Sequence, residues 1–232
     1  NQKGRLSFAR TLAWGWRGQM ASAFILLMAC MADLPLWADG IRDVWQTVPD
    51  SIVPAIDRVH RLEMLDLVDY KVKAEVKNLL GEASVMDTLA QDFVQIRLSS
   101  ASTLQMKKLP MEQGDSVLCV VKTFAGPEKE SELHLFTQDW KALDASRLFD
   151  GKSIGELAGS LVQKPDTMSE SRFEELKAMI EPRMVSALLL QHENAVVVRL
   201  SLPLLSTEDK KLVNAIKLQR KFNWSGKSFK ES

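Results

Sequence analysis

Four short β-prone runs in the middle of the chain, each bounded by turn residues, constrain the fold more than any other feature. The turn segments are Ser99-Ser100, Gln113-Gly114-Asp115 and Gly126-Pro127, and each contains Ser, Gly, Asp or Pro, which dominate tight turns. Parallel strands need a crossover of about a dozen residues, and these separators are too short for one. The pattern therefore predicts an antiparallel meander. Its strands are expected over residues 93–98, 103–109, 116–124 and 132–137.

A second antiparallel element is expected near the C-terminus. Residues 184–191 and 195–202 flank His192-Glu193-Asn194, which is typical of a hairpin turn with Asn194 in the left-handed region. Phe222 and Trp224 alternate with polar residues and indicate a final strand.

Helical periodicity is expected in four segments. Asp50 or Ser51 can cap a helix that begins near Ile52 and ends near Asp69, because apolar residues recur there at helical spacing. The other expected helices cover residues 154–161, 171–180, and a segment that opens at Ser206 and Thr207 with acidic residues in its first turn.

Residues 70–77 allow two interpretations. Apolar residues at every second position favour a strand, whereas apolar residues at spacings of four from Val68 to Val76 would also continue the preceding helix. We favour the strand. The elements together predict an α+β fold of mainly antiparallel sheet, a meander plus a C-terminal hairpin and final strand, with flanking helices. We expect residues 39–232 to form a single α+β domain, with a subdivision at residues 143–166 as the alternative.

The N-terminal segment predicts export. Residues Met20 to Ala32 form an apolar run of thirteen, broken only by Ser22. Basic residues precede it, and the small-residue site Leu36-Trp37-Ala38 follows. A membrane-spanning helix needs about 20 apolar residues, so this run is typical of a signal peptide over residues 1–38. We expect a periplasmic or envelope-associated protein with no transmembrane helix in its mature chain.

Cys30 raises a second possibility for this segment. Leu27-Met28-Ala29-Cys30 approximates the cleavage box in which a small residue precedes an acylated cysteine, although Met28 fits that box poorly. Lipidation at Cys30 is therefore the alternative to an ordinary apolar cysteine within a cleaved signal peptide.

Charge and cysteine content exclude several classes of protein. Residues 1–38 contain four of the 30 basic and one of the 30 acidic residues, so the mature chain has 26 and 29, a net charge of −3. That balance argues against nucleic acid as a partner. The mature chain retains one cysteine, Cys119, inside an apolar run, which excludes an internal disulfide and predicts a buried, inert thiol.

Two short motifs resemble catalytic or phosphate-binding patterns without meeting their requirements. Gly151-Lys152-Ser153-Ile154-Gly155 matches a nucleophile elbow, but no buried strand precedes Ser153, so we do not expect a catalytic serine there. The same Gly-Lys-Ser sequence, and a second one at Gly226-Lys227-Ser228, lack the first glycine of a phosphate-binding loop.

The titratable residues form no recognisable ligand or catalytic spacing. His60, His134 and His192 are isolated, so we expect no metal site and no cofactor. Asp66 and Asp69 lie three apart on the expected helix and could pair as acid and base. The alternative is a solvated face on which Lys73 pairs with one of these two carboxylates.

The C-terminal segment has a marked excess of positive charge. Residues 210–232 carry a net charge of +6, which leaves −9 on residues 39–209. Such asymmetry can recruit an anionic partner, or the lysines can simply discourage edge-to-edge strand pairing. The candidate anion-binding patch consists of Lys210, Lys211, Lys217, Arg220, Lys221, Lys227 and Lys230.

Several motifs that occur in order resemble an uncharacterised family of exported Bacteroidetes proteins, catalogued as domain of unknown function 3256. The likeness extends well over residues 41–143 and only loosely beyond. The motifs are Pro49–Pro54, Lys73–Val76, Leu104–Pro110, Val120–Thr123 and Asp139–Leu143. The resemblance implies an exported bacterial protein and supplies no activity.

The favoured functional hypothesis is a non-enzymatic binding or assembly module of the bacterial envelope. Its partner would be an envelope protein, an anionic glycan or a lipid headgroup. The alternative is a hydrolase of a small or glycan substrate, whose Asp, Glu and His residues would be assembled only by folding.

Overall fold

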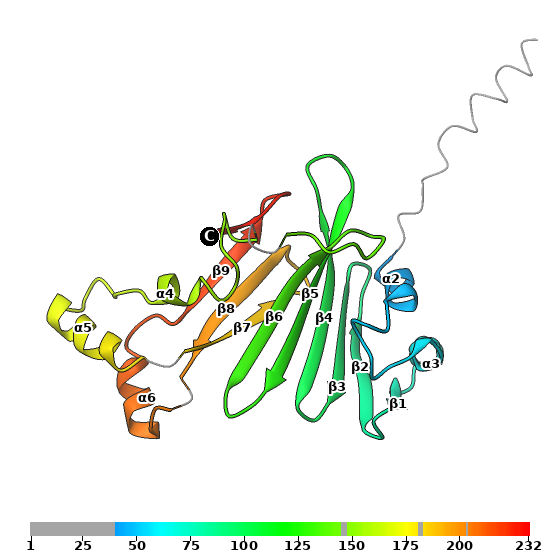
Figure 1. Cartoon of the computed structure of the whole chain (residues 1–232), viewed down its shortest axis with the longest axis horizontal. Coiled ribbons are helices and arrows are strands. Elements are labelled where there is room, and N and C mark those ends of the chain that lie inside the picture. Colours follow the sequence, from blue (N-terminus) through cyan, green and yellow to red (C-terminus); the bar gives the residue numbers. More distant parts are fainter. Residues whose placement is uncertain (1–39, 145–147, 181–182, 203) are drawn as a thin grey trace, which may run out of the picture. The chain divides into compact units, whose positions relative to one another are not determined.

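The meander predicted for the middle of the chain is present as one sheet of six antiparallel strands. A computed structural model describes residues 40–144, 148–180, 183–202 and 204–232. In it, each strand of the first sheet pairs with its neighbour in sequence (Figure 1). The strands are β1 (Glu75–Lys77), β2 (Ala83–Leu89), β3 (Phe93–Ser99), β4 (Ser102–Pro110), β5 (Ser116–Ala125) and β6 (Lys129–Phe136).

The first two strands depart from the sequence-based expectation. The strand expected over residues 70–77 is confined to β1, and β2 carries no clear alternation in sequence. The β2 pairing with β3 shifts register between Met86 and Thr88. A β-bulge of this kind interrupts the two-residue period, so alternation cannot reveal the strand.

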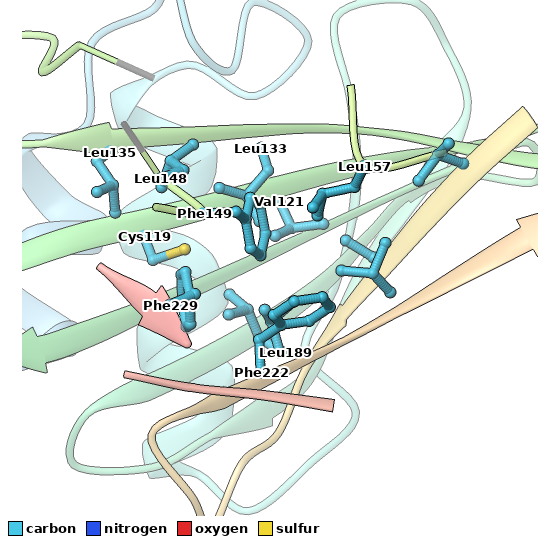
Figure 2. Close-up of a cluster of buried hydrophobic side chains, with 14 of the residues drawn as sticks. Cys119, Val121, Leu133, Leu135, Leu148, Phe149, Leu157, Leu189, Phe222 and Phe229 are labelled. Carbon is cyan, nitrogen blue, oxygen red and sulfur yellow. The ribbon is translucent and has the colours of Figure 1, made fainter. Parts of the chain in front are cut away.

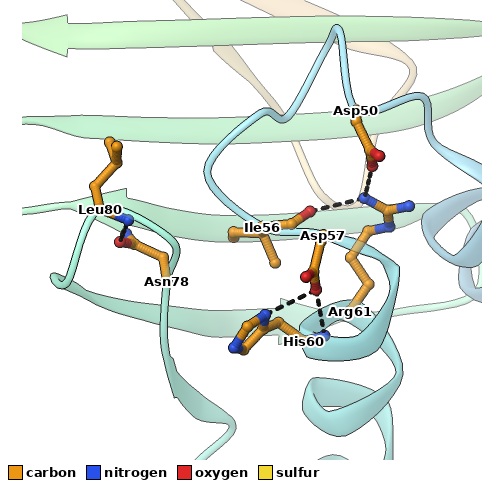
Figure 3. Close-up of polar contacts among 7 residues, drawn as sticks. All are labelled: Asp50, Ile56, Asp57, His60, Arg61, Asn78 and Leu80. Carbon is orange, nitrogen blue, oxygen red and sulfur yellow. Dashed lines mark hydrogen bonds and ion pairs between the residues drawn. The ribbon is translucent and has the colours of Figure 1, made fainter.

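The first helical region also begins later than expected. Helix α2 spans Ile41–Thr47, and helix α3 spans Arg58–Asp69 instead of starting near Ile52. The cap of α3 is Asp57, whose carboxylate accepts a hydrogen bond from the backbone N–H of His60 (Figure 3). Pro54 accounts for the difference, because proline disfavours helical backbone in the residue before it. The expected end at Asp69 is confirmed.

The second sheet has four antiparallel strands in the order β10-β9-β8-β7. The predicted hairpin is confirmed, but Asn194 is not left-handed: among the described non-glycine residues, positive φ occurs at Lys71, Trp140 and Asp150. The strands are β7 (Met184–Leu189), β8 (Ala195–Ser201), β9 (Gln219–Trp224) and β10 (Phe229–Glu231). The helices around this sheet are α4 (Ala158–Leu161), α5 (Glu170–Ala178) and α6 (Thr207–Val213). The α+β class with mainly antiparallel sheet is therefore confirmed.

Each face of the first sheet covers its own apolar cluster. One cluster joins the sheet to α2 and α3 and includes Trp45, Met64 and Ile96. The other fills the space between the two sheets and holds Cys119 of β5 and Phe222 of β9 (Figure 2). Aromatic packing reinforces the inter-sheet cluster. The ring of Phe149 meets Phe222 edge-on at 5.0 Å and stacks on Phe229 at 5.5 Å between centroids.

Polar side chains of the first sheet cap the free edge of β7. The N–H of Ala187 donates to Ser131 Oγ at 3.0 Å, and the N–H of Leu189 donates to Gln105 Oε1 at 2.9 Å. Just beyond the end of β7, Lys107 Nζ donates to the carbonyl of Gln191 at 2.8 Å. Because β7 pairs with no described strand on this side, the hydrogen bonds to Ser131 and Gln105 satisfy buried backbone groups that would otherwise lack partners.

Among the described residues, no helix is long and apolar enough to cross a membrane. The expected signal peptide over residues 1–38 and the expected lipidation at Cys30 lie outside the described residues.

Candidate functional site

Three adjoining hollows open on the outer face of the second sheet and share Arg199. On β8, Arg199 lies directly opposite Ser186 of β7 and Gln219 of β9. Directly opposed residues in antiparallel strands point to the same face, so these three side chains form one row. The hollows have volumes of about 340, 370 and 460 Å³. Together they form what we call the Arg199 cleft.

The 340 Å³ hollow lies where the outer face of the second sheet meets the first sheet. The first sheet contributes Gln95, Thr103 and Thr123, and the second contributes Leu188 and Val197. Thr103, like Leu109, occupies an odd-numbered position of β4, so both point to the face that covers the inter-sheet core. On this face of the first sheet, apolar residues such as Leu109 belong to the inter-sheet core, and polar residues such as Thr103 line the cleft.

The other two hollows extend from Arg199 towards α6. Glu128 and Lys210 line the 370 Å³ hollow and form an ion pair across it, which joins the β5–β6 turn to α6. Ser206 caps α6 by accepting a hydrogen bond from the N–H of Asp209, and this fixes the helix that carries Lys210. Ile216 and Lys217 line the 460 Å³ hollow.

The cleft holds an excess of unpaired positive charge. Arg199, Lys129 and Lys217 form no side-chain ion pair or hydrogen bond with any residue that the structure describes. Among the described lining residues, Glu128 supplies the single carboxylate, and Lys210 neutralises it. Cations without a carboxylate partner among the described lining residues are suited to binding an anion. The same described lining offers no free carboxylate that could act as a general base.

Sequence reasoning did not identify Arg199 or Lys129. Arg199 interrupts the apolar run of β8 at a position whose neighbours, Val198 and Leu200, are buried. A charged residue at an outward position of a strand is the usual pattern for a solvated face. Only the register with Ser186 and Gln219 marks this position as the centre of a cleft.

The structure disperses most of the predicted C-terminal patch. Two of its residues, Lys210 and Lys217, line the Arg199 cleft. Five pair with carboxylates: Lys210 with Glu128, Lys211 with Glu208, Arg220 with Glu231, Lys221 with Glu193, and Lys227 with Glu112. These pairs lower the charge that an external anion would meet. Anion binding by Lys210, Lys211, Lys217, Arg220, Lys221, Lys227 and Lys230 stays a prediction.

Two members of that patch point to opposite faces of β9. Arg220 lies opposite Val198, which is buried in the inter-sheet core, whereas Lys221 lies opposite Val197, which lines the cleft. A single anion-binding surface therefore cannot include both side chains.

Ser153 has a local structural partner. Its N–H and Oγ both donate to Glu156 Oε2, at 2.7 and 2.8 Å. These hydrogen bonds stabilise the ionised form and lower the pKa of Glu156, which makes that carboxylate a weaker base. The pair orders the turn before α4 and lacks the features of an activated nucleophile.

The three histidines lie on separate elements. His60 Nδ1 contacts Asp57 Oδ1 at 2.7 Å, and hydrogen bonds from the backbone and ring of His60 lower the pKa of Asp57 (Figure 3). His134 lies on β6, 3.9 Å from Glu132, and His192 lies in the β7–β8 turn. Within the described part of the chain, no group of three His, Cys, Asp or Glu side chains is placed to hold a metal ion.

Asp66 and Asp69 are both exposed, as expected for a solvated face, but the expected pairing of Lys73 with one of them is wrong. Asp69 pairs with Arg42 of α2, and Lys73 pairs with Glu75 instead of with either aspartate. The reason is that α2 packs beside α3, a tertiary contact that helical spacing does not encode. Cys119 is fully buried as predicted, and burial raises the pKa of its thiol.

Comparison with known proteins places the chain in a family. The family model described as "Protein of unknown function (DUF3256)" matches residues 34–229. A solved domain of an uncharacterised protein from Porphyromonas gingivalis W83 shares the fold, with a TM-score of 0.65 and 21% identity over 83% of this chain and 98% of that one. No curated protein matches. The match over most of the chain shows that this protein belongs to the DUF3256 family.

Proposed function

We propose that the protein is an exported, non-enzymatic binding or assembly module of the bacterial envelope that holds an anionic ligand in the Arg199 cleft. The observation that carries the proposal is the unpaired charge of Arg199 and Lys129 in a hollow whose described lining contains no carboxylate. Ser186, Thr103 and Gln219 add hydroxyl and amide groups that have no side-chain partner among the described residues.

The physical basis is the strength of charge-assisted hydrogen bonds. A hydrogen bond to a charged group contributes about 1.5–3 kcal/mol, more than a neutral one. The guanidinium of Arg199 presents several donors in a fixed plane, which matches a carboxylate or phosphate group.

The domain organisation is part of the same proposal. A signal peptide over residues 1–38 would be followed by one α+β domain over residues 39–232. The inter-sheet core supports a single domain because it combines Leu148, Leu157 and Leu161, from the segment considered as a boundary, with residues of both sheets. The sequence pattern of residues 1–38 supports export to the periplasm or envelope.

Export is tested by the mass of the N-terminal peptide of protein recovered from the cell envelope. A mature chain that begins at Asp39 supports signal-peptide cleavage. A chain that begins at Cys30 with an acyl-sized mass increment supports the lipid-anchor alternative, and an intact N-terminus recovered from the cytoplasm contradicts export.

Anion binding is tested by calorimetric titration with three probes: a polyglutamate peptide, an oligogalacturonate and inorganic phosphate. We expect at least one probe to bind, with affinity about tenfold or more lower for Arg199→Gln. Arg58→Gln is the matched control, because Arg58 is an exposed arginine of α3 without an ion pair among the described residues. No binding of any probe, or equal losses in the two variants, would refute the proposal.

A further inference from the structure

We propose that the ligand of the Arg199 cleft is an extended acidic peptide segment of a partner protein. This inference rests on the proposed anion-binding function and specifies the class of partner. It follows from three properties of the cleft: its extent, the chemistry of its lining, and the hydrogen bonds that already occupy the edge of the neighbouring strand β7.

The cleft is too extended for a single small anion. Its three hollows, of about 340, 370 and 460 Å³, meet at Arg199, and each is within the range of a pocket for one drug-sized ligand. The unpaired cations are distributed among them, with Lys129 in two hollows and Lys217 in the third. A chain that carries several carboxylates can occupy the hollows together.

The lining combines aliphatic and polar groups in the way that a peptide requires. Leu188 of β7 is 51% exposed and lies opposite Val197, so apolar side chains of a ligand could remove both residues from water. Ser186 and Gln219 offer hydrogen-bonding groups for peptide amides. A saccharide lacks aliphatic side chains, and the described lining contains no aromatic ring on which a sugar could stack.

The binding mode is across the face of the second sheet and not along its β7 edge. The N–H groups of Ala187 and Leu189 on that edge are already bonded to Ser131 and Gln105. A peptide therefore cannot add a strand beside β7 at these positions, so side-chain contacts must provide most of the recognition.

The test is selection of 12-residue peptides from a random phage-displayed library on the full-length protein, with counter-selection on Arg199→Gln. We expect the selected peptides to be enriched in Asp and Glu with interspersed aliphatic residues. In fluorescence anisotropy, a labelled selected peptide should bind about tenfold or more weakly to Arg199→Gln. Its affinity should fall when it is shortened to four residues.

Leu188→Ser separates the apolar contact from the charge. We expect this variant to weaken peptide binding several-fold, whereas Leu204→Ser, at a 76% exposed leucine outside the cleft, should leave it unchanged. If no peptide survives counter-selection while oligogalacturonate or phosphate binds in an Arg199-dependent manner, the peptide inference fails and anion binding stands. If neither peptides nor these anions bind, both proposals fail.

Discussion

Replacing Gln105 by leucine tests whether side chains of the first sheet hold the edge of β7. The Gln105 Oε1 atom accepts the N–H of Leu189, a residue that is 2% exposed. Leucine is close to glutamine in size but cannot accept this hydrogen bond. The Leu189 N–H would then be buried without a partner, because no strand of the described residues pairs with β7 on that side.

The expected loss of stability follows from the contacts involved. An unsatisfied buried donor costs about 1–3 kcal/mol, and the added apolar surface of leucine offsets part of that cost. We therefore expect the free energy of unfolding to fall by about 1–2 kcal/mol. With a urea m-value of about 2 kcal/mol/M, the unfolding midpoint should fall by about 0.5–1 M. Ser131→Ala should act similarly through Ala187.

Urea denaturation and amide hydrogen exchange together check this reasoning. Exchange of the Leu189 amide should accelerate more in Gln105→Leu than exchange of amides within the β4–β5 ladder. Gln219→Leu is the matched control, since Gln219 is exposed and its side chain has no hydrogen bond to a described residue. A Gln105→Leu protein with the stability and Leu189 exchange rate of this control would refute the edge-capping role.

Three further outcomes follow from individual residues. The pKa of Asp57 is lowered in the folded state. Its ionised carboxylate therefore stabilises the fold above its unfolded pKa of about 4, and this stabilisation is lost as pH falls through the lower folded value. Asp57→Asn, which retains a capping side chain, should unfold in urea with a weaker pH dependence over this acidic range. Cys119 should resist alkylation in the folded protein and react in denaturant, as followed by peptide mass spectrometry, because it is buried and its thiol pKa is raised. Gly226→Ala should lower the midpoint of thermal unfolding, because Gly226 has a φ of +92° and an added Cβ would lie 2.8 Å from Glu112 Cγ. Gly155→Ala is the control and should leave the midpoint unchanged, because an added Cβ there would meet no atom within 4 Å.

Local sequence was sufficient for the elements whose boundaries depend on turns. The meander from β3 to β6 could be predicted because short separators with Gly, Pro, Asp and Ser leave no alternative to antiparallel pairing. The same reasoning located the β7–β8 hairpin. It missed β2, where the bulge after Met86 removes the two-residue period, and it began α3 too early because it did not weigh Pro54.

The candidate site depended on contacts between distant segments. The excess charge of residues 210–232 was visible in the sequence, but its neutralisation was not, because Lys210 pairs with Glu128 and Lys227 with Glu112, both far away along the chain. The cleft at Arg199 exists only because β7, β8 and β9 align Ser186, Arg199 and Gln219 while the first sheet lies beside them.

The sequence by itself determined the secondary structure class and the pairing of neighbouring strands, because turn chemistry and side-chain alternation act over a few residues. The tertiary structure decided which cations lack partners and which polar residues cap the β7 edge. Those outcomes depend on where the two sheets meet. The Gln105 side chain and the backbone N–H of Leu189, 84 residues apart, have no local pattern that records their contact.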